Sequence, residues 1–160
     1  MAKKQKILIG WEEWCAFPEL KLPAIKAKVD TGAKTSCLHA FNIETFNENG
    51  QKYVRFSIHP MQNNKRTVRV CTSPIVDYRY VTNSGGKKEK RYVIKSDIKM
   101  DGRKWTIEIT LAKRDTMSFR MLLGREAMRK GGLVVDPSKS CRLGKVDKET
   151  FKQLYENKNI

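Results

Sequence analysis

The chain has few of the residues from which metal sites and disulfide frameworks are built. Its 160 residues include two histidines, His39 and His59, and four widely spaced cysteines with no Cys-x-x-Cys pair. There is no His-Glu-x-x-His motif and the cysteines lack the spacing of zinc ligands, so we expect no metal site. In a reducing compartment, widely spaced cysteines of this kind are most simply free thiols, and we expect them to be unpaired.

Long apolar runs and phosphate-binding loops are also missing. No segment approaches the ~20 apolar residues that cross a bilayer. The basic N-terminus is followed by only a short apolar stretch, residues 7–11, before Glu12 and Glu13. This stretch is too short for a signal peptide, so we expect a cytoplasmic protein with no membrane partner. No glycine-rich phosphate loop occurs, and we expect neither ATP nor another cofactor to bind.

Acidic residues are scarce relative to basic ones. The chain has 33 Lys and Arg against 17 Asp and Glu, which gives a formal net charge of +16. A surplus of this size predicts an anionic partner, such as a nucleic acid, an anionic membrane surface or an acidic polypeptide. Basic residues alternate with apolar ones, as in segment 65–70, and this indicates a charged face on a sheet rather than a disordered arm.

Most of the chain shows the period-two pattern of short strands. Asn49-Gly50 and Asp101-Gly102 are signals for tight hairpin turns, and helices are expected only at 125–130 and 147–157. Many short strands with few helices predict an all-β, small closed β-barrel. We expect residues 1–144 to form this domain and residues 145–160 to be a C-terminal helical appendage. The expected strands are 7–17, 25–29, 41–46, 53–58, 67–76, 91–100, 105–112 and 119–123.

Asp30 is notable within this basic sequence. It follows the apolar segment 24–29 and precedes Thr31-Gly32, so its carboxylate can lie at the mouth of a tight loop where a strand ends. Gly32 allows close approach of the backbone, and Thr31 can hydrogen-bond to a second copy of the loop. The alternative is an ordinary turn, in which the Asp30 side chain accepts hydrogen bonds from backbone N–H groups.

A second motif favours a catalytic role for Asp30. Leu122 and Leu123 form a buried apolar pair that precedes Gly124 and a predicted helix start at Arg125. Asp-Thr-Gly followed by this pattern resembles the retropepsin-like aspartic peptidases, in which the apolar-apolar-Gly strand lies beside the catalytic loop. The segments IGWEEWCAFPELKLPAIKAKVDTGAKTSCLHA, RMLLGREAM and LVVDPSKS are similar to one branch, labelled RimB-like or ATP-dependent zinc protease, over nearly the whole chain.

This resemblance implies a retropepsin-like fold and hydrolysis of peptide bonds by a water molecule held between two aspartates. Only one Asp-Thr-Gly motif is present, so the second Asp30 would come from a second copy of the chain in a twofold homodimer. The branch implies removal of glutamate tails from a protein such as a ribosomal protein. It also implies a functional link to an ATP-grasp glutamate ligase, which is the partner that uses ATP.

Basic side chains are the candidate contacts for such an acidic substrate, because ammonium and guanidinium groups bind carboxylates. Lys34 lies two residues beyond Gly32, at a position where the family more often has Arg. We expect a hairpin at 56–69 to form the flap over the cleft. The further candidates are His39, Arg66, Arg91, Arg120 and Arg125. Of these, Arg91, Arg120 and Arg125 match arginines of the family pattern.

Two other interpretations stay open at this point. Cys37 and His39 are two residues apart and would share one face of a strand, where they could form a nucleophile–base pair. His39 is more simply a structural or substrate-contacting residue. Basic strands with aromatic residues nearby also suit a non-catalytic module that binds nucleic acid or an acidic protein. A peptidase needs Asp30, whereas such a module does not.

Overall fold

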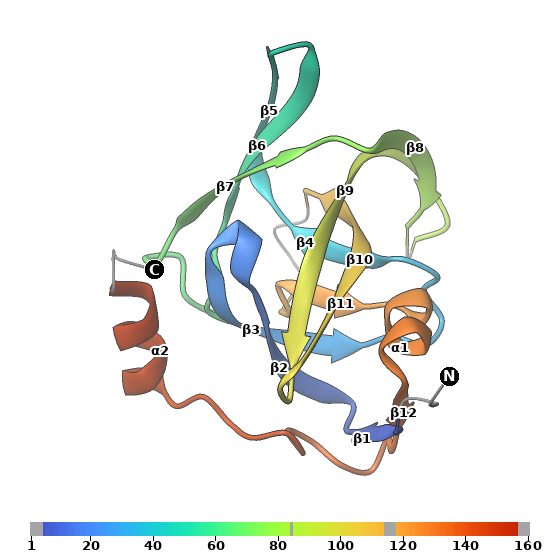
Figure 1. Ribbon diagram of the computed structural model, residues 1–160, viewed down its shortest axis with the longest axis vertical. Coiled ribbons are helices and arrows are strands. Elements are labelled where there is room, and N and C mark those ends of the chain that lie inside the picture. Colours follow the sequence, from blue (N-terminus) through green and yellow to red (C-terminus); the bar gives the residue numbers. More distant parts are fainter. Residues whose placement is uncertain (1–4, 84, 114–117, 157–160) are drawn as a thin grey trace.

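The computed structural model describes residues 5–83, 85–113 and 118–156 and is dominated by strands, as the sequence predicts (Figure 1). The helices within these ranges are α1 (Arg125–Gly131), α2 (Lys148–Glu156) and a short 3-10 turn, η1 (Pro18–Leu20). The strands are β1 (Ile7–Ile9), β2 (Glu12–Phe17), β3 (Leu22–Val29), β4 (Ser36–His39), β5 (Phe41–Glu48), β6 (Gln51–Ile58), β7 (Arg69–Pro74), β8 (Asp77–Thr82), β9 (Lys88–Met100), β10 (Arg103–Ala112), β11 (Met121–Leu123) and β12 (Leu133–Val135).

Six strands pair around a ring. Their hydrogen-bonded order is β10-β4-β11-β3-β2-β9, and β9 pairs again with β10, while β8 extends the sheet beyond β9. The β9–β10 hairpin is long, but β2 meets β9 at a single registered pair, Ala16 with Lys99. The molecule is therefore mostly β, as the sequence predicts. Its ring of strands is not a true closed barrel, because β2 and β9 are joined at only one registered pair.

The core fills the inside of this ring. Successive residues of a strand point to opposite faces, and the inward positions carry side chains such as Phe17, Ile25, Leu38 and Ile109, which are fully buried. Removing this apolar surface from water is the main favourable contribution to folding. The same core holds β3, β4 and β11 in a fixed arrangement, which matters for the site described below.

The two predicted tight turns are confirmed. Asn49 and Gly50 have φ angles of 51° and 77°, and Asp101 and Gly102 have 48° and 74°. Positive φ at both central residues is what two-residue turns of strongly twisted hairpins require. The first turn joins β5 and β6, which project from the body of the molecule and pair with β7 (Figure 1).

Both predicted helices are present. α2 begins after Asp147, whose Oδ1 accepts a hydrogen bond from the Thr150 N–H at 2.7 Å, and this bond lowers the pKa of Asp147. Phe151 is buried against Trp14, and the Tyr155 hydroxyl donates to the carbonyl of Ala24 on β3. α2 thus packs on the strands, and the division of the chain at residue 145 stays a prediction.

The sequence pattern missed β4, β8 and β12 and joined β1 to β2. A β-carbon on Gly10 would lie 2.3 Å from the carbonyl oxygen of Lys139, and the Trp11 N–H donates to that oxygen. This close approach of two distant segments separates β1 from β2. None of the helices in the described ranges is long and apolar enough to cross a bilayer.

Candidate active site

Asp30 lies where β3 ends, in a tight loop held by backbone hydrogen bonds. Its N–H donates to the Leu123 carbonyl at 2.9 Å, and the Ala33 N–H donates to the Asp30 carbonyl at 3.2 Å. The Gly32 N–H donates to Oδ1 of the carboxylate at 3.0 Å. Oδ1 thus caps the turn, as the simpler interpretation of the sequence predicts. The side chain is partly exposed and makes no second hydrogen bond to the part of the chain that is described.

β11 lies between β3 and β4, beside the Asp30 loop. It runs parallel to β3, with Leu123 opposite Val29, and antiparallel to β4, with Leu122 opposite Cys37. The next residue, Gly124, donates its N–H to the Ser36 hydroxyl at 2.9 Å. A β-carbon on Gly124 would lie 2.7 Å from the backbone of Thr35, so only glycine fits. The segment Leu122-Leu123-Gly124 therefore lies beside the loop. Leu123 and Gly124 are buried, whereas Leu122 is half-buried and lines the adjacent cleft, so the two leucines are not the fully buried pair that the sequence predicts.

The start of α1 holds the other side of the loop. The Arg125 N–H donates to the Ala33 carbonyl at 2.7 Å, and the Glu126 N–H donates to the Lys34 carbonyl at 3.0 Å. The Arg125 guanidinium donates to the carbonyl of Thr31 at 2.9 Å. Arg125 thus contacts the loop backbone and is not among the side chains that line the adjacent cleft.

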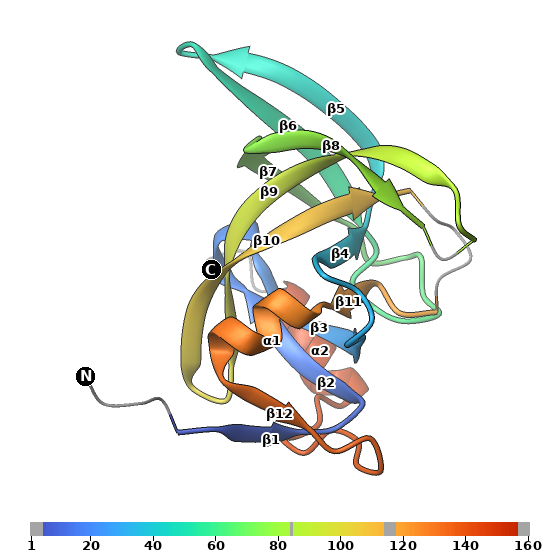
Figure 2. The same cartoon turned by 90° about the vertical axis from the view of Figure 1, so that its right-hand side faces the viewer.

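A cleft of about 650 Å³ opens in front of Asp30. One wall is the loop itself, and the opposite wall is the β8–β9 hairpin, including Arg79, Tyr80 and Asn83. Figure 2 shows this hairpin arching beside β4. The expected flap at 56–69 is wrong, because no residue of that segment lines this cleft. β8 was missed because its side chains are exposed or only half-buried, so it lacks an apolar period.

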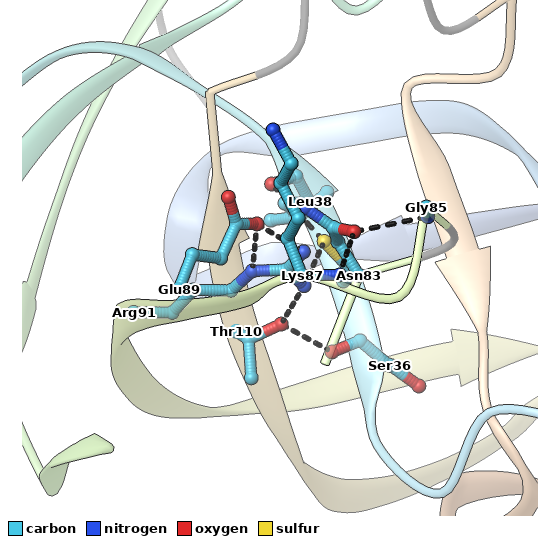
Figure 3. Close-up of polar contacts among 9 residues, drawn as sticks. Ser36, Leu38, Asn83, Gly85, Lys87, Glu89, Arg91 and Thr110 are labelled. Atoms are coloured by element: carbon cyan, nitrogen blue, oxygen red, sulfur yellow. Dashed lines mark hydrogen bonds and ion pairs between the residues drawn. The ribbon is translucent and has the colours of Figure 1, made fainter. Parts of the chain in front are cut away.

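Arg91 lines the cleft and is 8% exposed, and Figure 3 shows its contacts with Glu89 and Thr110. Its Nε donates to Oε1 of Glu89 at 2.7 Å, and Nη2 contacts the same oxygen. Nη1 donates to the Thr110 hydroxyl at 3.4 Å and lies 3.6 Å from the Cys37 sulfur. Glu89 therefore neutralises a nearly buried cation on the same strand.

The structure places the other predicted contacts as follows. Lys34 lines the cleft and is exposed. His39 and Arg120 are buried and adjacent, since the His39 N–H donates to the Arg120 carbonyl at 2.9 Å, and neither lines the cleft. Arg66 is exposed and lies outside it. Because Cys37 lines the cleft and His39 does not, the arrangement offers no support for a Cys–His nucleophile pair.

Arg79 is a charged cleft residue that the sequence pattern did not single out. Its guanidinium donates to Glu108 at 2.8 Å and to Asp77 at 3.3 Å, and the hydrogen bond to Glu108 raises the pKa of Arg79. No motif marks this position, because Arg79 on β8 reaches Glu108 on β10 only through the pairing of both strands with β9. Within the described residues, no three His, Cys, Asp or Glu side chains are grouped so that they could hold a metal ion.

Comparison with known proteins agrees with this geometry. A family model described as RimB-like, retropepsin-like aspartic endopeptidase RimB, matches residues 8–144. Curated relatives named probable alpha-L-glutamate ligase, from Desulfotalea psychrophila and Shewanella pealeana, are each 51% identical over 150 residues. The match covers 94% of this chain and 32% of each relative, so the chain spans about a third of their length.

A solved structure gives the same fold. The crystal structure of a protein of unknown function from Legionella pneumophila matches with a TM-score of 0.73 and 27% sequence identity. The match covers 85% of this chain and 97% of that one. The family model and the topology around Asp30 agree, and the chain belongs to the RimB-like family of retropepsin-like aspartic endopeptidases.

Proposed function

We propose that this protein is an aspartic-type peptidase that hydrolyses peptide bonds in acidic, glutamate-rich tails. The observation that carries the proposal is the position of Asp30. Its carboxylate has one oxygen fixed by Gly32, is partly exposed, and lies at a cleft that also contains Lys34 and Arg91. A lone turn-capping aspartate needs neither the cleft nor the basic side chains.

The proposed mechanism uses two Asp30 carboxylates, one from each chain of a homodimer. The pair shares one proton, because two like charges at close range do not both ionise readily. The ionised carboxylate removes a proton from water while the oxygen of that water attacks the peptide carbonyl carbon. The protonated carboxyl donates its proton to the carbonyl oxygen. The carboxyl that took the proton from water then gives it to the peptide nitrogen, while the other carboxylate takes back the proton of the former carbonyl oxygen. The carbon–nitrogen bond breaks, a carboxylic acid forms, and the pair again holds one proton.

The charge of the protein supports an acidic substrate. The net charge of +16 attracts anions at long range. Lys34 supplies an exposed cation at the cleft, beside Arg91, which is paired with Glu89 in the absence of substrate. The curated relatives are named glutamate ligases. A ligase that adds glutamates and a peptidase that removes them act on the same polymer. We therefore propose glutamate tails on a protein, such as a ribosomal protein, as the substrate and a functional link to such a ligase.

Incubation of the purified protein with a peptide that carries an oligoglutamate tail, at neutral pH and with mass-spectrometric readout, tests the proposal. We expect the wild type to remove glutamates and Asp30→Asn to be inactive, because asparagine keeps the acceptor for the Gly32 N–H but not the carboxylate. Asp101→Asn is the matched control, since it makes the same charge change in an exposed turn outside the cleft. Equal cleavage by wild type and Asp30→Asn would refute the proposal.

A second candidate function is a basic binding module for nucleic acid without catalysis. It is favoured by Tyr78 and Tyr80 on β8, which are 46% and 66% exposed and lie 4.8 and 5.4 Å from the Lys90 ammonium. Exposed rings beside a cation can stack on bases. This candidate predicts that the protein binds single-stranded nucleic acid. The affinity should fall steeply as the salt concentration rises and should be unchanged in Asp30→Asn.

A further inference from the structure

A second groove continues from the Asp30 cleft along the side of the molecule. It has a volume of about 640 Å³ and shares Lys34, Thr35 and Arg79 with the cleft, so the two hollows are contiguous. Its other walls come from β9, β10 and α1, which lies beside β10 (Figure 2). We call it the Lys95 groove, after the β9 residue that lines it. Its charged lining residues beyond the shared ones are Lys95, Glu108, Glu126, Arg129 and Lys130.

The acidic residues of the Lys95 groove are already neutralised. Glu108 accepts a hydrogen bond from Arg79 at 2.8 Å, and Glu126 accepts one from Arg129 at 3.2 Å. Lys95 is directly opposite Glu108 in the β9–β10 register, yet it forms no ion pair with the described part of the chain. Lys34 likewise has no ionic partner among the described residues and is exposed. Lys34 and Lys95 thus offer their ammonium groups to an outside anion.

The lining favours an acidic polypeptide over a nucleic acid. Among the described residues, none of the side chains that line the Lys95 groove is aromatic. Stacking on aromatic rings is the usual means of binding single-stranded bases. The volume lies within the ~300–1,000 Å³ typical of ligand pockets. An extended peptide advances about 3.4 Å per residue and points alternate side chains to one side, so a run of glutamates presents carboxylates repeatedly along such a groove.

We propose that the Lys95 groove binds the part of an acidic polypeptide that extends beyond the Asp30 cleft, with Lys34 at the junction and Lys95 further along. This inference rests on the proposed function, which puts the bond that is cleaved beside Asp30. It adds that affinity depends on the length of the tail: a short tail fills only the cleft, whereas a longer tail also reaches Lys95.

The test measures binding of fluorescently labelled peptides with three or ten glutamates to the full chain carrying Asp30→Asn, by anisotropy at fixed salt. Adding Lys95→Glu is expected to weaken binding of the ten-glutamate peptide about three- to tenfold, since the substitution replaces an attraction between exposed charges with a repulsion. The affinity for the three-glutamate peptide is expected to change by less than about twofold. Lys99→Glu is the matched control, because it makes the same charge change on an exposed residue of β9 that does not line the groove.

The outcomes separate the two proposals, because the assay requires no cleavage. If Lys95→Glu weakens binding of the long peptide more than that of the short one, and Lys99→Glu does not, the groove is supported. This holds even if the wild type hydrolyses no peptide, whereas absence of hydrolysis would count against the proposed peptidase activity. Equal loss with both substitutions, no effect of either, or no binding of the long peptide would overturn the groove. An equal effect of Lys95→Glu on an oligonucleotide of the same charge would overturn its assignment to an acidic polypeptide.

Discussion

Gly124 and Thr35 approach each other so closely that a β-carbon on Gly124 would lie 2.7 Å from the carbonyl carbon of Thr35 and 2.9 Å from its oxygen. Thr35 belongs to the segment that joins the Asp30 loop to β4, and Gly124 joins β11 to α1. The absence of a side chain at position 124 therefore sets how near β11 can lie to the loop that carries the Asp30 carboxylate.

We expect Gly124→Ala to push these segments apart. Overpacking of a buried position costs about 1–3 kcal/mol of the free energy of unfolding, and displacement of the Asp30 loop should abolish cleavage of glutamate tails even where the protein stays folded. Urea unfolding and the mass-spectrometric assay measure the two effects. Gly85→Ala is a suitable control for stability, because its added β-carbon makes an ordinary contact of 3.4 Å. A Gly124→Ala protein of wild-type stability would contradict this account of the packing.

The two-carboxylate mechanism predicts how mixtures of wild type and Asp30→Asn behave. After subunit exchange in an equal mixture, about one quarter of the dimers carry two aspartates, so activity per wild-type chain should fall to about half. A monomeric catalyst would show no such loss. Cleavage rates across a series of mixing ratios, with sedimentation to confirm the dimer, distinguish a quadratic dependence on the wild-type fraction from a linear one.

The contact between Arg91 and Glu89 predicts opposite effects of two substitutions. Glu89 occupies the guanidinium edge that a substrate carboxylate would use, so Glu89→Gln is expected to lower KM for glutamate tails by about fivefold, the equivalent of one exposed ion pair. Arg91→Gln is expected to raise KM at least about tenfold through loss of a charge-assisted hydrogen bond.

Steady-state kinetics on a single tail length measure both Arg91 and Glu89 variants. Glu44→Gln is the control for the change in net charge, because Glu44 is exposed on β5 and faces Arg55 at 3.9 Å, outside the cleft. If Glu89→Gln and Arg91→Gln shifted KM in the same direction, competition between Glu89 and substrate for Arg91 would be excluded.

Two buried thiols predict a loss of stability at alkaline pH. Burial raises the pKa of Cys15 and of Cys71 to about 12, from an ordinary value of 9.0. Between these pH values the unfolded chain loses the thiol protons and the folded chain keeps them. The free energy of unfolding should therefore fall as pH rises, by at most about 1.4 kcal/mol per pH unit for each thiol.

Urea unfolding of the wild type and Cys71→Ala at several pH values between 8.5 and about 11 measures this fall. Lysines and tyrosines that titrate in the same range are common to both proteins, so the difference between their slopes belongs to Cys71. The variant should start less stable and lose stability more slowly. Parallel slopes would show that the Cys71 thiol does not resist ionisation in the folded state.

The local elements and one side of the site were predictable from the sequence. Asn49-Gly50 and Asp101-Gly102 fix their turns because few other residue pairs adopt positive φ twice in succession. Asp147 and the apolar face of α2 fix that helix, and the Leu122-Leu123-Gly124 motif indicated which strand supports the Asp30 loop. These features depend on residues close in sequence or on a motif whose arrangement repeats in a family.

The opposite wall of the cleft was decided by the tertiary structure. β8 has no apolar period because it covers a cleft instead of a core. The flap was therefore expected at 56–69, whereas Arg79 and Tyr80 of β8 line the cleft in front of Asp30. Sequence alone determined that the chain is a basic, mostly β protein with one Asp-Thr-Gly loop. The set of basic side chains near that loop was decided by strand pairing between distant segments. The register of a sheet, and not proximity in the chain, determines which side chains share a face.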